Sequence, residues 1–356
     1  MKRIGTPIHE LAPAAGNPRN SEGAFLRLKN GELLFAYSRF KGESWGDFAV
    51  CDIAAIRCKG SVWSEPEILF SAKSLGTKNV MSVSLLRLDN GDIGLFFIVR
   101  DNGEGLSDIR LHLFRSHDEG KTWDQPVCCI PEPGYNVTNN DRVVRLKSGR
   151  LIVPCSLHKN DLAAGVFNPG GTVRFTCSDD GGKTWSNLGG MSVPESRFDQ
   201  NGYQEPGIIE LSDERLYCWI RTDLGRQYEM LSFDGGETWS IPKPSIFTAP
   251  LSPLSMKRLP DGRLFAVYNP IPNYNTRNLS KAGWGRTPLV GALVNQEITK
   301  IEKTFLIEDD PEAGYCYCAI HPETDRMFLA YCCGGAKDEG CLQRLRLTEI
   351  RYENLN

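Results

Sequence analysis

The sequence predicts an all-β protein, a six-bladed β-propeller of four-stranded antiparallel blades, and three observations support this prediction. An octapeptide of the form Ser-x-Asp-x-Gly-x-Thr-Trp occurs three times, at 116–123, 178–185 and 232–239. A hairpin signature, in which a tight polar turn separates two apolar segments, recurs at even spacing along the chain. No segment has the convincing periodicity of an amphipathic helix. Repeated small antiparallel sheets of this kind close into a ring.

Each octapeptide predicts a hairpin turn. Its Asp can accept hydrogen bonds from backbone amides ahead of it, its Gly tolerates a positive φ, and its Trp supplies an apolar anchor behind the turn. Trp123, Trp185 and Trp239 are 62 and 54 residues apart, a period that suits one multi-stranded unit per copy. We therefore expect the octapeptides to mark blades and to lie on the outside of the propeller, far from the substrate.

The hairpin signature locates two strands of each unit, because Asn-Gly and Asp-Gly turns between apolar runs are the strongest short-range hairpin signals. Its copies are 26–38, 86–99, 144–156, 209–221, 257–269 and, in degenerate form, 321–333. A decayed octapeptide segment follows the first copy, the fifth unit has lost the octapeptide, and the segment 341–350 is expected to complete the last blade. The predicted blades are roughly 20–70, 80–130, 138–195, 203–248, 252–308 and 314–350, in a single domain of residues 1–356.

The overall composition excludes several classes of partner. The net charge of −3 offers no basic face to nucleic acid. No stretch reaches the about 18 uninterrupted apolar residues that span a bilayer, so no membrane partner is expected. The segment 1–16 lacks the apolar run of a signal peptide. We expect a cytoplasmic protein, or a secreted one if the N-terminus was trimmed.

The twelve cysteines are expected to be buried free thiols rather than a disulfide framework. Most lie in apolar strand-like runs or in close pairs, and a chain of 356 residues does not need covalent cross-links. No pair has C-x-x-C spacing, and the five histidines show no paired spacing. We therefore expect no metal and no cofactor.

Arginines recur where the predicted strands end, and strand ends surround the central channel of a propeller. They are Arg19, Arg39, Arg100, Arg142, Arg221 and Arg286. Converging guanidinium groups favour an anionic substrate, because each offers a bidentate fork for a carboxylate. The alternative is that each arginine pairs with an acid on a solvated rim.

Candidate acids and phenols lie at similar positions. Asp47 lies in the loop after the first hairpin, Glu205 precedes the fourth hairpin, and Tyr315 and Tyr317 precede the sixth. A turn role for Asp47 and a packing role for the tyrosines are the alternatives. Candidate contacts in substrate subsites are Arg100, Asp108, Asn140 and His158, each of which could instead be a solvated loop or rim residue.

The octapeptide resembles the Asp-box of the sialidase (neuraminidase) superfamily, and the order of the other features is similar across nearly the full chain. The resemblance implies an arginine triad of Arg19, Arg221 and Arg286 that holds a substrate carboxylate, with Arg39 beside it. It also implies Asp47 as general acid and base, Glu205 as helper base and Tyr317 as nucleophile. The chain departs from the family pattern at Asn20 and Ser21, where the family has an Arg-Ile-Pro tripeptide, and at Cys318, in the family's Tyr-Ser segment.

These residues predict an exo-acting retaining glycoside hydrolase that releases a terminal acidic sugar, sialic acid or a related 2-keto-3-deoxy sugar acid. A neutral phenol can approach an anomeric carbon that bears a carboxylate, whereas an anionic nucleophile is repelled. The expected partner is an acidic glycan or a small sugar-acid glycoside. Two alternatives stay open: a hydrolase of another acidic sugar (Kdn, Kdo or a uronate), and a carbohydrate-binding propeller without turnover. A protein-interaction scaffold fits the arginine-rich strand ends less well.

Overall fold

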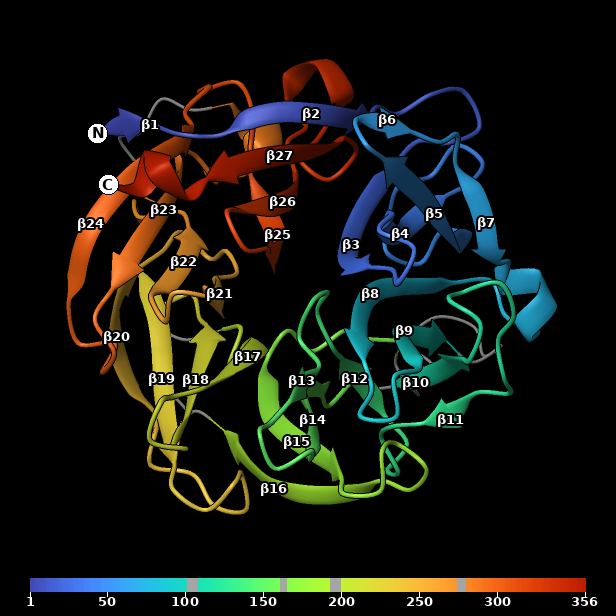
Figure 1. Ribbon diagram of the computed structural model, residues 1–356, viewed down its shortest axis with the longest axis horizontal. Coiled ribbons are helices and arrows are strands. Elements are labelled where there is room, and N and C mark those ends of the chain that lie inside the picture. The colour runs from blue at the N-terminus through green and yellow to red at the C-terminus, as the bar shows by residue number, and fades with distance from the viewer. Residues whose placement is uncertain (101–107, 161–164, 193–199, 274–279) are drawn as a thin grey trace.

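The protein is all-β, as predicted, in a computed structural model that describes residues 1–100, 108–160, 165–192, 200–273 and 280–356. Its strands form largely antiparallel sheets, and the helices of the described segments are short 3-10 turns. The sheets are set around a central axis in chain order, from blue to red in Figure 1. None of the described helices has the length and apolar character needed to cross a membrane.

The first sheet in the ring contains the first predicted hairpin. Its strands are β3 (Asn20–Arg27), β4 (Leu33–Phe40), β5 (Cys51–Lys59), β6 (Val62–Trp63) and β7 (Glu67–Phe70). The central strands β4 and β5 are buried along almost their whole length, because both faces pack against neighbouring sheets. The loop between β4 and β5 carries Asp47.

The second and third predicted blades are joined into one nine-stranded sheet. The strands are β8 (Val80–Arg87), β9 (Ile93–Arg100), β10 (Ile109–Ser116), β11 (Val127–Cys128), β12 (Tyr135–Val137), β13 (Val144–Arg145), β14 (Leu151–His158), β15 (Gly171–Ser178) and β16 (Ser186–Ser192). The short strand β12 pairs in parallel with β10 and antiparallel with β14. No turn signal in the sequence predicts this strand pairing, because the pairing partners of β12 lie in two different hairpins.

Two further sheets follow along the chain. The first consists of β17 (Gln204–Glu210), β18 (Leu216–Arg221), β19 (Arg226–Ser232) and β20 (Lys243–Thr248). The second consists of β21 (Ser255–Arg258), β22 (Leu264–Tyr268), β23 (Leu289–Val294) and β24 (Ile301–Glu308), with β1 (Lys2–Arg3) parallel to β24 at its edge.

The last sheet combines both ends of the chain. It contains β25 (Cys316–Pro322), β26 (Arg326–Cys332), β27 (Leu345–Arg351) and the N-terminal strand β2 (Thr6–Leu11). The C-terminal segment is therefore the third strand, and β2 is the outermost one, antiparallel to β27. Figure 1 shows the two termini close together beside this sheet. The sequence prediction included the C-terminal strand and missed β2.

The octapeptides form the turns between β10 and β11, between β15 and β16, and between β19 and β20. In the second copy the Asp180 carboxylate accepts hydrogen bonds from the backbone amides of Lys183 and Thr184 and from the hydroxyls of Ser178 and Thr184. These bonds lower the pKa of Asp180. The predicted turn chemistry is confirmed, and Gly182 has the expected positive φ of 90°.

Trp123 and Trp239 pack on the sheet that precedes their own, and Trp185 packs on an earlier strand of its own nine-stranded sheet. The Trp239 ring stacks on Phe175 of β15 with ring centroids 4.4 Å apart, Trp185 meets Phe96 of β9, and Trp123 lies against Phe70 of β7. In two of the three copies the predicted apolar anchor therefore links neighbouring sheets as well as supporting the turn. Such aromatic contacts contribute to packing beyond the area that they bury.

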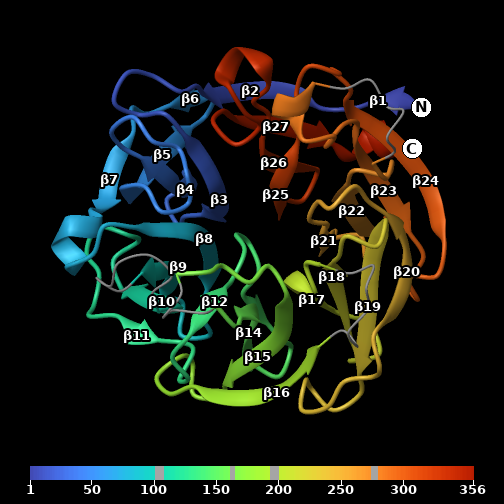
Figure 2. The same cartoon turned by 180° about the vertical axis from the view of Figure 1, so that it is seen from behind.

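The strands β3, β8, β17, β21 and β25 lie on the inner side of the ring in both views of the molecule (Figures 1 and 2). Strand β3 contacts β8 and β25, and β21 contacts β17 and β25. The inner strands therefore define the place where side chains from distant parts of the chain can meet.

All twelve cysteines are free thiols, and eleven are buried.

Candidate functional site at the inner strands

One residue in each of four inner strands leaves the regular strand conformation. These residues are Glu22 in β3, Ser82 in β8, Glu205 in β17 and Tyr317 in β25, with φ values of 53°, 63°, 45° and 56°. The pairing register of each strand shifts at that residue. A β-bulge of this kind re-aims a side chain, and a positive φ at a non-glycine residue needs support from its surroundings. All four side chains line one cavity of about 80 Å³.

Close packing and one predicted site residue hold the bulges. Gly23 follows Glu22, and a Cβ atom there would lie 2.3 Å from the Phe35 ring, so only glycine fits. The Asn140 side-chain amide donates hydrogen bonds to the carbonyls of Gly23, at 2.8 Å, and Tyr317, at 3.2 Å. Asn140, predicted as a substrate contact, therefore ties the bulge of β3 to that of β25.

Glu205 and Tyr317 form a pair that faces the cavity. The Tyr317 hydroxyl donates to Glu205 Oε1 at 3.0 Å, and Arg221 Nη1 lies 2.8 Å from the same oxygen. Glu205 Oε2 is buried and has no hydrogen-bond partner within the described segments. Burial and the adjacent Glu205 raise the pKa of Tyr317 well above its ordinary value, although Arg221 and Arg286 oppose the shift. The phenol is therefore neutral and has a base beside it.

Arg19 is buried, lines the same cavity and is already paired with carboxyl groups. Its Nη1 lies 2.6 Å from Asp47 Oδ1, its Nη2 lies 3.0 Å from Glu22 Oε2, and its Nε donates to Ser21 Oγ at 2.9 Å. Burial lowers its pKa, but Asp47 and Glu22 outweigh that effect and raise the pKa overall. Asp47 is 59% exposed, so solvent and ligands can reach it.

Glu22 is a third carboxyl group at this cavity, beside Asp47 and Glu205. It is 5% exposed. Burial raises the pKa of Glu22 to about 7, and the neighbouring Asp47 and Glu205 add to the shift, while Arg19 opposes it. The cavity therefore combines arginines with carboxyl groups that already neutralise part of their charge.

Arg286 contacts the predicted nucleophile from the other side. Its guanidinium lies 5.5 Å from the centre of the Tyr317 ring and 5.0 Å from that of Trp284. Its Nη1 donates to the Sγ of Cys316 at 3.0 Å. Burial alone would raise the pKa of Cys316, but hydrogen bonds from Cys332 and Cys341 together with Arg286 lower it well below the ordinary thiol value. A buried thiol group is thus a partner of this arginine.

Arg100 lines the cavity beside Asp47. Its guanidinium lies 4.5 Å from the centre of the Phe48 ring and 5.5 Å from that of Tyr135, and its Nη2 donates to the Asp47 carbonyl at 3.5 Å. These contacts hold the loop that carries Asp47 against β9. Arg100 therefore belongs to the candidate site.

Besides Arg221, Arg286 and Asn140, three further predicted substrate contacts lie outside the cavity lining. Arg39 pairs with Asp52 in the register of β4 and β5, and Asp108 forms an ion pair with Arg110 at 2.7 Å. His158 lies behind Tyr135, with its Nδ1 3.0 Å from the Asn168 carbonyl, and burial lowers its pKa. Their local partners account for Asp108 and His158 without a substrate.

Sequence reasoning missed Glu22, Ser82 and Tyr135, all of which line the cavity. A usable signal exists for the first two. Glu22, Ser82 and Glu205 precede the turn residues Gly31, Gly91 and Glu214 by the same nine residues, and each of these turn residues has a positive φ. The shared offset marks equivalent bulge positions in three hairpins. Tyr315, the alternative nucleophile, is buried in an apolar cluster instead.

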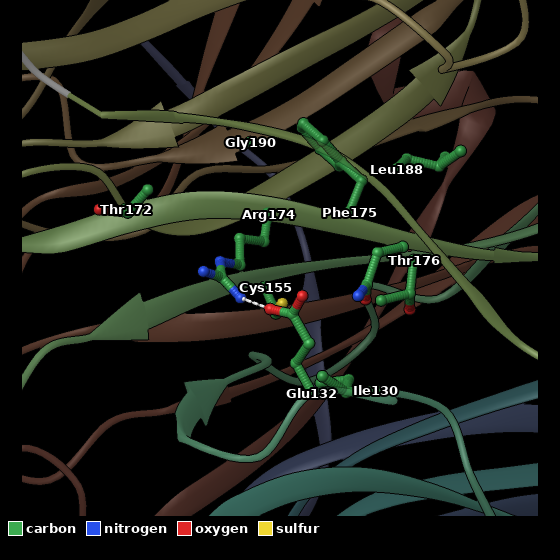
Figure 3. A pocket seen from close by; sticks show the side chains of 10 residues that line it. Ile130, Glu132, Cys155, Thr172, Arg174, Phe175, Thr176, Leu188 and Gly190 are labelled. Carbon is green, nitrogen blue, oxygen red and sulfur yellow. Dashed lines mark hydrogen bonds and ion pairs between the residues drawn. The ribbon is translucent and has the colours of Figure 1, made fainter.

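A larger hollow elsewhere carries none of the predicted site residues. It has a volume of about 290 Å³ and lies against β14, β15 and β16, where an ion pair joins Arg174 to Glu132 (Figure 3). Phe175 and Leu188 contribute apolar walls, and no carboxyl pair or phenol faces it. Within the described ranges, no group of three or more His, Cys, Asp or Glu side chains is placed to hold a metal ion. The cavity at the inner strands is therefore the candidate site.

A family model described as the BNR repeat-like domain matches residues 31–329. The chain belongs to this family. Among curated proteins, this BNR repeat protein is similar to the anhydrosialidase of Macrobdella decora, with 29% identity over 187 residues. The match covers 49% of the chain and only 22% of the length of that relative. Both findings agree with the resemblance of the octapeptides to the sialidase superfamily.

Solved structures share the fold of this BNR repeat protein along its whole length. A protein of unknown function from Dyadobacter fermentans has a TM-score of 0.72 at 19% identity, covering 98% of this chain and 99% of its own. A sialidase from Streptococcus pneumoniae has a TM-score of 0.70 at 16% identity, covering 99% and 71%. A leech intramolecular trans-sialidase has a TM-score of 0.70 at 15% identity, covering 100% and 71%.

Proposed function

We propose that this protein is an exo-acting retaining glycosidase that releases a terminal acidic sugar, sialic acid or a related 2-keto-3-deoxy sugar acid, from a glycan or small glycoside. The observation that carries the proposal is the Tyr317–Glu205 pair, 3.0 Å apart at a cavity that Asp47 also lines. A neutral phenol beside a base and a separate, solvent-accessible carboxyl group are the parts that a two-step displacement at a carboxylate-bearing carbon requires.

In this proposal Glu205 removes the proton from Tyr317 as the phenol oxygen bonds to the anomeric carbon. Asp47 protonates the leaving oxygen, and the glycosidic bond breaks. In the second step Asp47 takes a proton from the incoming hydroxyl, the new bond forms at the anomeric carbon, and the tyrosyl bond breaks with return of the proton to Tyr317. Asp47 must first release Arg19, which lies 2.6 Å away, or share it with the substrate.

Arg221 and Arg286 are proposed to hold the sugar carboxylate, since both contact Tyr317 of the inner strand β25. The Arg221 Nε is buried without a protein partner among the described residues, so it keeps hydrogen-bonding capacity for a ligand. Arg19, the third arginine of the expected triad, is already paired with Asp47 and Glu22, so a carboxylate that binds it bidentately must compete with both.

The architecture is part of the same proposal: one domain with six propeller blades, of which the second and third are joined in the nine-stranded sheet. The ring of sheets in Figure 1, the contacts between inner strands and the sialidase-like solved structures support it. The strand β12 and the shared sheet around it lie between the second and third blades.

A release assay tests the function. Fluorogenic glycosides of N-acetylneuraminic acid, Kdn, Kdo and glucuronic acid are incubated with the wild-type protein and with Asp47→Ala. We expect release from one of the sugar-acid glycosides and a loss of about 10²- to 10⁴-fold in the variant. Silence on all four substrates would overturn the proposal in favour of a carbohydrate-binding propeller. NMR of the product distinguishes a free sugar from the anhydro sugar of an intramolecular transfer.

A further inference from the structure

Glu22 has no task in the proposed reaction, although its position matches those of Glu205 and Tyr317. All three residues are bulge residues of inner strands with positive φ, and all three line the same cavity. Glu22 therefore carries the same backbone strain as the two proposed reactive groups, and Gly23 and Asn140 hold it in place. Retaining a buried carboxyl group at such a position requires compensating interactions.

The two oxygens of Glu22 have different surroundings. Oε2 accepts hydrogen bonds from Arg19 Nη2, at 3.0 Å, and from Ser21 Oγ, at 3.3 Å. Oε1 has a single long contact within the described segments, Ser82 Oγ at 3.4 Å. A carboxylate oxygen has lone pairs for about two hydrogen bonds. Oε1 thus retains accepting capacity at the cavity.

Asn139 adds an unused donor to the same cavity. Its Oδ1 accepts from the Asn140 backbone amide at 2.7 Å, while its Nδ2 is buried without a partner among the described residues. Asn139 is 3% exposed and lines the cavity with Glu22. A buried amide nitrogen without a partner is unfavourable, and a ligand that accepts a hydrogen bond would relieve it.

A hydroxyl group is the ligand chemistry that uses an acceptor and a donor together, because it donates one hydrogen bond and accepts others. An ammonium group fits poorly, since Arg19 and Arg100 face the same space. We propose that Glu22 is a specificity-determining residue that accepts a hydrogen bond from a hydroxyl of the bound sugar, with Asn139 Nδ2 donating to the same hydroxyl. This inference rests on the proposed function, namely that the cavity binds the released sugar.

The proposal also assigns Arg19 a positioning role. While Glu22 binds a sugar hydroxyl through Oε1, its Oε2 stays on Arg19, and the arginine orients the carboxyl group instead of taking the substrate carboxylate bidentately. The sugar acid is then held by its carboxylate on Arg221 and Arg286 and by a hydroxyl on Glu22. Sugars that lack the hydroxyl are discriminated against, because the buried polar groups stay unpaired.

Calorimetric titrations with deoxy sugars test this assignment. The acid among N-acetylneuraminic acid, Kdn, Kdo and glucuronic acid that binds most tightly to the wild-type protein is compared with analogues that each lack one hydroxyl. We expect one analogue to bind about 10- to 100-fold more weakly than its parent. This penalty is the ratio of the dissociation constants of the analogue and its parent. In Glu22→Ala the ratio should fall to about one. In Glu22→Gln, which keeps the shape of the side chain, the ratio should be reduced.

Glu229→Gln is the matched control, because Glu229 is also a poorly exposed glutamate with a lysine and a tyrosine as partners, but it lies outside the cavity. It should retain the full wild-type penalty. An unchanged penalty in both Glu22 variants would overturn the assignment while leaving the proposed function intact. If none of the four acids binds the wild-type protein, the proposed function fails and the Glu22 assignment fails with it. Should Glu22→Ala not fold, the reduced penalty in Glu22→Gln decides.

Discussion

The octapeptide turns and the inner-strand bulges both contain acidic residues, but these residues have different roles in the two regions. In the turns, the carboxylates of Asp118, Asp180 and Asp234 accept hydrogen bonds from groups two to four residues away, and these bonds lower their pKa values. In the bulges, Glu22 and Glu205 are buried and meet groups from other strands. The comparison shows that a recurring acid with local partners supports the fold, whereas a buried acid with unused lone pairs is available for chemistry.

The largest expected effect concerns the bulge side of this comparison. Tyr317→Phe removes the hydroxyl that lies 3.0 Å from Glu205 and keeps the ring that packs against Arg286. We expect turnover of the active glycoside to fall on the order of 10³-fold or more, because the variant lacks the proposed nucleophile. Steady-state kinetics measure the loss. Full turnover in the variant would contradict the nucleophile assignment.

The second-largest expected effect concerns the octapeptide turns. Trp239→Ala removes the ring that stacks on Phe175 of the preceding sheet. The free energy of unfolding should fall by about 3 kcal/mol, since a large aromatic contact and its apolar burial are lost. Urea denaturation measures this change, and the KM of the folded protein should stay within a factor of about two. A selective loss of turnover without a stability change would reverse the roles of the two regions.

The third effect is a loss of stability with rising pH that we expect from Glu22 and that has the opposite sign to the effect of the turn aspartates. Burial raises the pKa of Glu22 to about 7, so the folded protein binds a proton that the unfolded chain has released above its ordinary carboxyl pKa. This contribution to stability is present at low pH and is lost as the pH rises toward 7. Between about pH 4.5 and 7, the free energy of unfolding of the wild-type protein should fall by about 2 kcal/mol more than that of Glu22→Gln. Identical pH profiles for both proteins would refute the raised pKa of Glu22.

The smallest expected effect concerns an aspartate of an octapeptide turn. Asp180→Ala removes an acceptor of four hydrogen bonds near the surface. We expect a loss of about 1 kcal/mol in the free energy of unfolding and unchanged kinetics. Because the folded pKa of Asp180 is lowered, its contribution is present at neutral pH and disappears as the pH falls through the acidic range. A fall in turnover larger than the fall in stability would show that the turns are coupled to the site.

The sequence was most informative where partners are near in the chain. The octapeptide turns, the hairpins and the all-β class follow from spacings of a few residues, and Asp47, Glu205 and Tyr317 could be selected by their order along the chain. It was least informative about β2 and β12. Strand β2 pairs with β27, more than 300 residues later, and β12 bridges two hairpins, so neither pairing leaves a local pattern.

The candidate site could likewise be predicted only in part from the sequence. The chain by itself determined which reactive residue types are present at strand ends, because turn chemistry and alternation set where each strand stops. Only the tertiary structure decided that Glu22 and Ser82 join Glu205 and Tyr317, that Arg19 is already paired with two carboxyl groups, and that Arg39 lies outside the cavity lining. The physical reason is the bulge. A side chain that a bulge re-aims toward the cavity depends on contacts from other strands, which a linear sequence does not display.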